Sequence, residues 1–463
     1  MYRTSPDTGR QPARPSGASL VAVPVVNSLD STAGEHRLPT RTRLAAGVGM
    51  AVGSLSRRMG RGSGSVIGGR AILAIDPQAL AHLARGRDVA LVSGTNGKTT
   101  TTSLLSAALS LRGPVVSNAL GANLPPGITA ALAAASPTAR QAALEVDEAW
   151  LGRVAAATDP DVVLLLNLSR DQLDRNNEVR RLAATWRAVL AERLAQGRAP
   201  HVVANADDPL VAWAAEESAS VTWVGAGQRW TDDAAGCPNC GGRIRFPGDE
   251  NAGDGWACGD CPFRRPGLDV SLDQDCVVLV DGTRIPVHLQ LPGRCNLANA
   301  AMAMSAAARF GVDRAQAVAA MQDRSEVAGR YRTVTVGGVS ARLLLAKNPA
   351  GWLEVFDLLS PAPTPVVVAI NAQIADGRDP SWLWDVPFER LRGRLVVATG
   401  ERSADLAVRL RYADVEHRRQ PNLLAAIAEA GAHHGSQTGP SKVDVVANYT
   451  SFQAINRQVA RVD

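Results

Sequence analysis

The stretch "DVALVSGTNGKTTTTSLLSAAL", residues 88–109, carries the strongest structural signal in this chain. An apolar run comes first, a glycine-containing turn follows, and a helix-forming run completes it. Glycines in such a turn let backbone N–H groups face a polyphosphate, and the helix N-terminus adds its dipole. The order strand, turn, helix predicts a nucleotide-binding loop whose ATP-binding residues are Gly94, Thr95, Asn96, Gly97, Lys98, Thr99 and Thr100.

Two side chains of this loop have predicted chemical roles. Lys98 is expected to reach the β- and γ-phosphates, and the Thr99 hydroxyl is the natural ligand for Mg²⁺. The spacing GxxGKT is two residues shorter than the common GxxxxGK[ST] loop. We expect the loop to face solvent, so that Lys98 contributes to catalysis and little to folding. The alternative is a structural glycine turn that binds nothing.

An acidic cluster follows the apolar strand expected at Ala142–Val146. Parallel sheets present ligands at the carboxyl ends of their strands, and Mg²⁺ requires a carboxylate in addition to the loop. Glu145, Asp147 and Glu148 are the candidates, and Glu145 is the predicted magnesium ligand. The alternative for each is a solvated acidic turn.

Four of the six cysteines form two CxxC pairs separated by seventeen residues, Cys237 with Cys240 and Cys258 with Cys261. Four thiolates close a tetrahedral Zn²⁺ site and leave no open position for catalysis. The pattern therefore predicts a structural zinc ribbon over residues 231–265. Nearby arginines leave a nucleic-acid-binding ribbon as an alternative. The two remaining cysteines, Cys276 and Cys295, are predicted to be ordinary buried residues.

The rest of the chain alternates short apolar runs with alanine-rich helical stretches. Strands are expected at 89–93, 142–146, 162–166, 201–204, 221–224, 277–279 and 287–289, and a second series at 341–345, 366–370, 395–399 and 443–447. Such alternation is typical of parallel α/β sheets. It divides the chain into an N-terminal extension (1–40), an ATP-binding domain with the inserted ribbon (41–327) and a C-terminal α/β, Rossmann-like domain (328–463).

The basic character of the chain is confined to its N-terminal part. Residues 1–70 hold ten Lys/Arg and three Asp/Glu, a charge of +7, which leaves −2 of the total +5 for the remainder. A nucleic-acid groove through the body is therefore not expected. No apolar stretch is long enough to predict a membrane span. Residues 1–40 are predicted to be disordered and cytoplasmic, and 41–61 to form a helix that is either solvated or in contact with an anionic lipid surface.

Several motifs resemble the ATP-binding middle domain of the Mur ligases, which activate a carboxylate as an acyl phosphate and couple it to an amine. They are "SGTNGKTTTT" (93–102), "EVDE" (145–148), "LNLSRDQLDR" (166–175), "ANADDP" (204–209) and "LPGRCNLANAAMA" (291–303). The resemblance implies that Asn296 and Asn299 lie at the adenine side and that Arg330 meets the γ-phosphate. It also implies that Asn205 and Asp208 belong to the nucleotide site.

The chain departs from the peptide-forming Mur pattern in four places. Only about 50 plausibly ordered residues precede the loop, where those enzymes carry a UDP-sugar domain. Gln172 follows Asp171 where the family has histidine, and Cys295 replaces the histidine before Asn296. The segment "TWRAVLAERLAQ" lacks the lysine that the family carbamoylates.

The chain resembles the MurT family more closely, from about residue 41 to the end and including the cysteine ribbon. The C-terminal motifs are "LLLAKNPAGW" (343–352), "NAQIADGRDPSWLWDVPFE" (371–389), "ATGERSADLAVRL" (398–410) and "ANYTSF" (447–452). The resemblance implies a subunit that uses ATP and Mg²⁺ to amidate the D-glutamate α-carboxylate of lipid II at the inner face of the cytoplasmic membrane. Ammonia would come from a GatD-type glutamine amidotransferase, whose Cys–His pair Asp379 completes as a catalytic residue.

Two other functions remain open from the sequence. One is a self-sufficient amino-acid ligase, similar to folylpolyglutamate synthase, that uses the same ATP core without an amidotransferase. The other is a nucleotide-regulated scaffold with the ribbon as its contact surface. Asp379 also has a simpler explanation, because an aspartate before proline is a frequent helix start.

Overall fold

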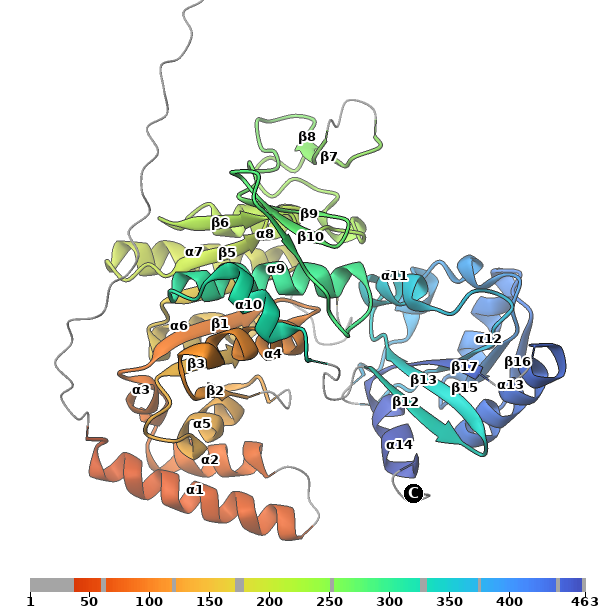
Figure 1. Ribbon diagram of the computed structural model, residues 1–463, viewed down its shortest axis with the longest axis horizontal. Helices are drawn as coiled ribbons and strands as arrows, with labels where there is room; N and C mark the ends of the chain where they lie inside the picture. Colours follow the sequence, from red (N-terminus) through yellow and green to blue (C-terminus); the bar gives the residue numbers. More distant parts are fainter. Residues whose placement is uncertain are drawn as a thin grey trace, which may run out of the picture.

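The computed structural model describes residues 37–59, 64–118, 122–170, 179–249, 254–324, 331–373, 376–438 and 442–459. Within them the chain forms two α/β bodies that lie side by side, and a small lobe projects from the first (Figure 1). Predictions for Asp171, Gln172 and Arg330 concern residues outside these ranges. The same holds for most of the 1–40 extension and for the predicted boundary between residues 327 and 328.

The first body is built on a nine-stranded sheet in the order β11-β10-β9-β6-β5-β4-β1-β3-β2. Strands β1 to β6 run parallel, and β1 lies between β3 and β4. Their bounds are β1 Asp88–Ser93, β2 Val115–Ser117, β3 Gln141–Glu145, β4 Val162–Leu165, β5 His201–Asn205 and β6 Val221–Val224. The parallel sheet predicted for residues 88–224 is therefore present.

Three strands extend this sheet: β9 Val270–Asp273, β10 Cys276–Leu279 and β11 Arg284–Pro286. β9 pairs parallel with β6, and β10 runs antiparallel to both β9 and β11. The strand predicted at 287–289 is wrong in position, because β11 begins directly after a tight turn. Gly282 has φ +85°, and Leu279 N–H donates to Thr283 O at 2.9 Å. The turn fixes the register of the hairpin nearer to the glycine than the apolar pattern indicates.

Helices cover both faces of this sheet, as alternating strand residues require. Val89 and Leu91 of β1 face one core, and Ala90 and Val92 face the other. The first core also receives α3 Ala79–Ala84, α5 Pro125–Ala134, α6 Leu151–Thr158, α7 Val179–Ala195 and α8 Pro209–Ala215. The second receives α4 Lys98–Leu109, α9 Arg294–Arg309 and α10 Arg314–Met321.

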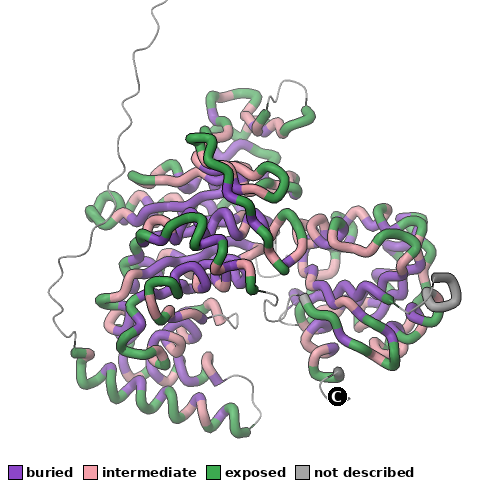
Figure 2. Tube along the Cα trace, viewed as in Figure 1, coloured by how far each residue is buried: buried purple, intermediate pink, exposed green. Residues whose placement is uncertain are grey.

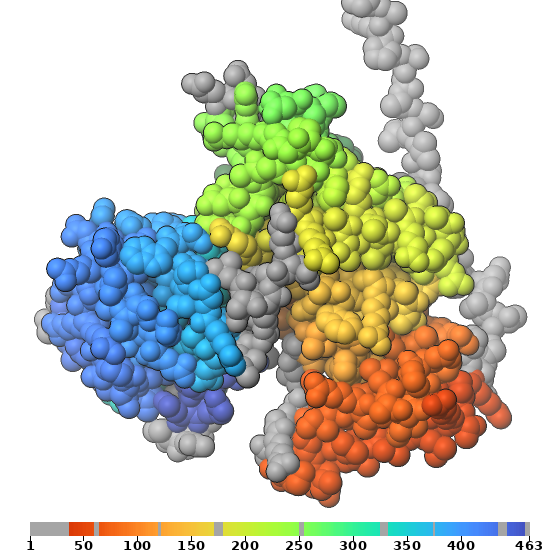
Figure 3. Space-filling model, turned by 180° about the vertical axis from the view of Figure 1, so that it is seen from behind, coloured from red at the N-terminus to blue at the C-terminus, as the bar shows by residue number. Residues whose placement is uncertain are grey.

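Two further helices, α1 Thr40–Arg58 and α2 Ser65–Ile75, pack on each other at the end of this body. Figure 3 shows them in red and orange, at the far side from the second body in blue. The helix predicted for residues 41–61 is thus present as far as Arg58, and residues 60 and 61 lie outside the described ranges.

The second body holds a six-stranded sheet in the order β12-β13-β17-β14-β15-β16, in which only β12 runs antiparallel. The strands are β12 Tyr331–Val336, β13 Val339–Leu345, β14 Val366–Ala369, β15 Val396–Thr399, β16 His417–Arg419 and β17 Lys442–Ala447. Helices α11 Pro349–Leu358 and α12 Ser403–Tyr412 cover one face, and α13 Leu423–Thr438 and α14 Tyr449–Val459 the other. The predicted C-terminal α/β fold is confirmed.

The projecting lobe contains β7 Ile244–Arg245 and β8 Ala257–Cys258, which pair antiparallel. Its apolar core is very small and consists mainly of Ile244, Trp256 and Phe263. Short 3₁₀ turns complete the described structure: η1 Ser110–Arg112, η2 Glu148–Trp150, η4 Asp232–Ala234, η5 Ser381–Trp384 and η6 Phe388–Leu391. Among the described residues, no helix combines the length and the apolar character needed to cross a bilayer.

Candidate active site

The phosphate loop lies between β1 and α4, at the carboxyl end of the central strand. Gly94 has φ +148° and Gly97 has φ +84°, backbone conformations that side chains with a Cβ rarely adopt. A Cβ on Gly97 would lie 2.7 Å from Asn299 Oδ1. Both glycines are therefore needed, and the expected order of strand, loop and helix is present.

The sequence predicts that Lys98 faces solvent, but the structure buries it. Its Nζ donates to Gly94 O at 2.5 Å and to Thr95 O at 3.3 Å, and lies 3.0 Å from Glu148 Oε2. The ammonium folds back because the loop carbonyls and a carboxylate from the β3 end surround it. A buried charge of this kind is tolerated only with such partners.

The three acidic candidates after β3 occupy different environments. Asp147 accepts from Ala149 N–H at 3.1 Å, which is a capping role, and Glu148 pairs with Lys98. Glu145 Oε1 accepts from Asn123 Nδ2 at 3.3 Å, whereas Oε2 is buried without a hydrogen-bond partner among the described residues. A buried oxygen without a donor suits a cation ligand. Of the three, Glu145 therefore fits Mg²⁺ best.

Two asparagines that the sequence interpretation missed, Asn167 and Asn348, contact the loop from two sides. Asn96 N–H donates to Asn167 Oδ1 at 2.9 Å, and Asn167 Nδ2 donates to Asn96 O at 3.1 Å. The Asn96 side chain also lies 3.3 to 3.4 Å from that of Asn348, which caps α11. Asn167 follows β4, the neighbour of β1, so the strand-end rule used for Glu145 could have identified it.

A cavity of about 260 Å³ opens between the loop and the second body. Its wall includes Asn96, Gly97 and Thr100 of the loop, Asn205, Asn296 and Asn299, and Ala350, Gly351 and Glu354 of α11. The structure thus brings Asn296 and Asn299, predicted for the adenine side, next to the loop. Their positions fit a nucleotide whose phosphates lie over α4.

Three other residues have surroundings that the sequence interpretation did not predict. Asp208 does not line the cavity, because its carboxylate accepts from Leu168, Leu210 and Val211 N–H and caps α8. Burial raises the pKa of Asp208 to about 6, although the three backbone hydrogen bonds act in the opposite direction and lower it. Cys276 and Cys295, predicted to be ordinary buried residues, are both only half-buried, and Cys295 lines the cavity. Desolvation, followed by the Glu354 carboxylate, raises the pKa of the Cys295 thiol to about 12.

An ion-pair cluster joins the two bodies beside the cavity. Arg229, which follows β6, pairs with Asp357 of α11, and Arg390 Nη2 lies 2.8 Å from the other Asp357 oxygen. Burial opposes ionisation of Asp357, yet both guanidinium groups hold its pKa below the usual range. The cluster connects the segment after β6 to α11 at the edge of the cavity.

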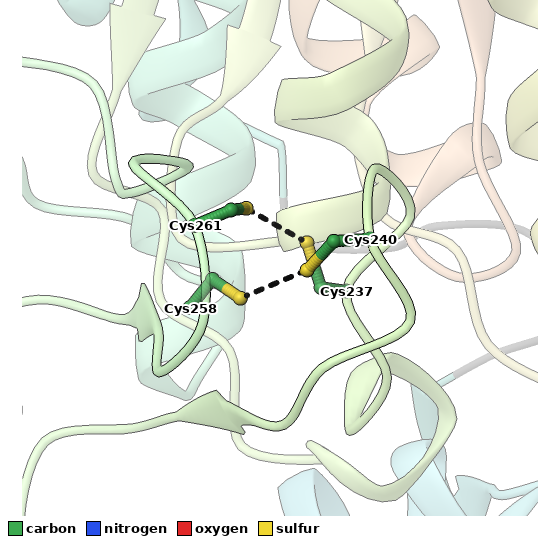
Figure 4. Close-up of side chains that lie close together, drawn as sticks. All are labelled: Cys237, Cys240, Cys258 and Cys261. Carbon is green, nitrogen blue, oxygen red and sulfur yellow. Dashed lines mark hydrogen bonds between the residues drawn. The ribbon is translucent and has the colours of Figure 1, made fainter.

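The four ribbon cysteines converge within the lobe, where their side chains face one another (Figure 4). Their sulfur atoms lie within 4.8 Å of one another, with Sγ–Sγ distances of 3.7 Å for Cys237 and Cys261 and 3.5 Å for Cys240 and Cys258. A tetrahedral ion with Zn–S bonds of about 2.3 Å separates its ligands by about 3.8 Å. The cluster therefore fits Zn²⁺, and it lies outside the cavity wall.

Asp379 lies in the loop between β14 and η5, half-buried at the surface. Its Oδ1 accepts from Ser381 N–H at 2.9 Å, which supports the helix-start explanation and leaves Oδ2 available to other groups. Asp376, which was missed, is buried and accepts from Thr450 N–H at 2.9 Å and from the Thr450 hydroxyl. Burial raises the pKa of Asp376. Asp376 anchors the loop on α14, while Asp379 remains at its surface.

Comparisons with known families match both bodies. A model of the Mur ligase middle domain matches residues 92–237, and a model described as MurT ligase C-terminal matches residues 345–452. Subunit MurT of the Streptococcus pneumoniae lipid II isoglutaminyl synthase (glutamine-hydrolyzing) is 32% identical over 377 residues, 76% of this chain and 83% of that protein. The MurT subunit from Staphylococcus aureus is 28% identical over 380 residues, which are 78% of this chain and 85% of that protein.

Solved structures support the fold. A pseudomurein peptide ligase type C from Methanothermus fervidus matches with a TM-score of 0.62 at 18% identity, over 81% of this chain and 79% of that one. MurF from Acinetobacter baumannii matches with a TM-score of 0.58 at 14% identity, and the match covers 84% of this chain and 80% of the MurF chain. With the sequence matches, these findings show that the chain belongs to the MurT family, with a Mur ligase fold.

Proposed function

We propose that this chain is the ligase subunit of a lipid II isoglutaminyl synthase. It converts the D-glutamate α-carboxylate of the lipid II stem peptide into D-isoglutamine, uses ATP, and receives ammonia from a GatD-type glutaminase with which it forms a heterodimer. The observation that carries the proposal is the MurT ligase C-terminal match, which contains Asp379, on a chain with a complete phosphate loop. Reaction at the inner face of the cytoplasmic membrane follows from the lipid-linked substrate.

The loop chemistry suits carboxylate activation. A carboxylate resists attack by ammonia because oxide is a poor leaving group, and transfer of the γ-phosphoryl group converts it into an acyl phosphate. Lys98, after release from Glu148, and Arg330 would neutralise the charge that develops on the phosphoryl oxygens. Thr99 and Glu145 would hold Mg²⁺, which supplies further charge compensation when bound.

Ammonia would then attack the acyl carbon, and phosphate would leave with the former carboxylate oxygen. Free ammonia is mostly protonated near neutral pH, so its production beside the acyl phosphate is an advantage. The glutaminase needs a thiol, a histidine base and a carboxylate that orients the histidine. Asp379 is our candidate for that carboxylate, because it lies at the surface on an anchored loop.

We propose that η5, which begins two residues after Asp379, contributes to the docking surface for this glutaminase. Trp384 of η5 is 54% exposed and Tyr412 of α12 is 74% exposed, and their rings contact edge to face with centroids 5.4 Å apart. Exposed aromatic pairs are enriched in protein interfaces. We therefore place the partner over η5 and the end of α12.

The decisive experiment replaces Asp379 by asparagine in the purified heterodimer. Asp379→Asn should preserve the complex, reduce glutamine hydrolysis by about 10⁴-fold, and leave amidation with added ammonium intact, because an amide cannot stabilise an imidazolium. Asp405→Asn, an exposed aspartate on α12, serves as the matched control.

Two results would contradict the assignment. Unimpaired glutaminase activity would leave Asp379 with only its turn-capping role. A variant that ammonium does not rescue would place Asp379 in the ligase reaction, and would favour a self-sufficient ligase over a subunit.

A further inference from the structure

Helix α1 exposes its large apolar side chains and buries its small ones. Its buried residues are Thr42, Ala45, Ala46, Gly49, Gly53 and Ser56. The large residues point outward, with exposed fractions of 65% for Leu44, 45% for Val48, 57% for Leu55 and 54% for Met59 at the C-cap. A helix on the surface of a water-soluble body normally shows the reverse arrangement.

The packing of α1 on α2 explains why the large side chains face away. A Cβ on Gly49 would lie 2.2 Å from Ile72 Cγ1, and a Cβ on Gly68 would lie 2.6 Å from Gly49 O. Backbones this close require glycine at the contact. The inner face of α1 therefore has no space for leucine or methionine, but this constraint does not explain why the outer face carries them.

Most of the exposed large apolar residues of α1 lie along one side of the helix, and Met50, 49% exposed, lies away from it. Leu44, Val48, Leu55 and Met59 are spaced i, i+4, i+11 and i+15, which aligns them along one side of the helix. We call these four residues the apolar stripe. Ile67 of α2, 43% exposed, adds to the apolar surface of this helix pair. Figure 2 shows α1 along the outer edge of the molecule, with its outward residues in green.

The charge around the stripe has a single sign. Residues 37–75 contain seven arginines and no aspartate, glutamate or lysine. Arg41, Arg43, Arg57 and Arg58 of α1 are exposed. The next carboxylate, Asp76, is buried and bonded to Thr42, so it does not offset this charge at the surface.

We propose that α1 docks on the surface of an anionic phospholipid bilayer, with the apolar stripe among the acyl chains and the arginines at the phosphates. A helix with leucine and methionine on one side, arginine at its borders and no acidic residue has the composition of an interfacial helix. The absence of carboxylates disfavours a protein partner, which would have to supply all the negative charge. The proposal goes beyond the proposed function, since it concerns binding to lipid and not amidation.

The test measures sedimentation of the full-length chain, in its heterodimer, with vesicles of phosphatidylcholine alone or mixed with phosphatidylglycerol. The complex should bind the mixed vesicles, bind less as salt rises, and ignore pure phosphatidylcholine. The triple variant Leu44→Gln, Val48→Gln, Leu55→Gln should bind at least about tenfold more weakly, because three apolar anchors are lost. Replacement of Arg57 by glutamine should weaken binding about fivefold.

A matched control uses the same residue types elsewhere. Leu111→Gln, Leu194→Gln and Val280→Gln alter two leucines and a valine that are 53%, 43% and 78% exposed outside α1. This control should bind vesicles like the parent chain. Circular dichroism verifies that both triple variants are folded.

Several outcomes would overturn the proposal. They are failure of the parent complex to bind anionic vesicles, equal binding by the stripe variant, or self-association that the stripe variant abolishes without any vesicle binding. The last would make a second copy of the chain the occupant. Amidation of a lipid-free stem peptide should be unchanged in the stripe variant. Absence of that reaction in the parent would count against the proposed function and leave the vesicle result valid.

Discussion

Lys98 Nζ lies 3.0 Å from Glu148 Oε2, and both side chains are buried. The lysine expected to contact the β- and γ-phosphates is therefore already paired with a carboxylate. If Lys98 binds these phosphates as proposed, a nucleotide must replace this contact, and we therefore predict that Glu148 weakens nucleotide binding.

Lys98→Met should abolish acceptor-dependent ATP hydrolysis and also destabilise the fold by about 3–5 kcal/mol, because it removes the buried ammonium that lies opposite the Glu148 carboxylate. Urea unfolding measures the loss. In the double variant Lys98→Met, Glu148→Gln most of the stability should return while hydrolysis stays absent. A single variant as stable as the parent would show that Glu148 is readily protonated or solvated.

Glu145→Gln should reduce ATP turnover about a hundredfold or more and raise the Mg²⁺ concentration needed for half-maximal rate, because charge stabilisation by a metal is worth several kcal/mol. Magnesium titration of ATP hydrolysis tests this. Asp147→Asn, which alters only a capping carboxylate, provides the control. Equal magnesium dependence in both variants would remove Glu145 from the metal site.

The cysteine cluster should bind about one zinc ion per chain, by the four-ligand count. Cys261→Ser should release the ion and make the lobe sensitive to protease, because its small core cannot fold without metal. Cys276→Ser, outside the cluster, should keep the zinc. Nucleotide binding should persist in both variants, and elemental analysis with limited proteolysis measures these effects. A metal-free chain with a protease-resistant lobe would contradict the assignment.

His201 should make the fold sensitive to acid. Burial, followed by the charge of Arg309, lowers its pKa from 6.5 to about 4, and its ring contacts the Ser220 and Thr222 hydroxyls at 2.8 Å. The unfolded chain binds a proton near pH 6.5 and the folded chain does not. This contribution to stability is therefore complete above pH 6.5 and is lost as the pH falls towards 4, by roughly 3 kcal/mol.

The control for this effect is His201→Gln, which lacks the titrating group. Its stability should be lower than that of the parent at pH 7, and the difference should shrink as the pH falls. Urea unfolding at several pH values gives the comparison. A constant difference between pH 7 and pH 4.5 would show that burial of His201 does not control acid sensitivity.

The sequence by itself determined the features that depend on neighbours along the chain. The strand, glycine turn and helix of the phosphate loop follow from local backbone preferences, and so do the apolar alternation of both sheets and the two CxxC knuckles. The positions of Asn296 and Asn299 came from a resemblance, and the structure brings them next to the loop.

Only the tertiary structure decided which groups meet across the fold. Burial of Lys98 depends on β1 and β3 being adjacent, which sets Glu148 beside the loop from 50 residues away. The contact between Asn96 and Asn348 spans 252 residues and two sheets. The outward stripe of α1 depends on Gly49 of α1 and Gly68 of α2, because their close approach decides which face of α1 is covered. Periodicity specifies that a helix has faces, but the covered face is set by packing against distant residues.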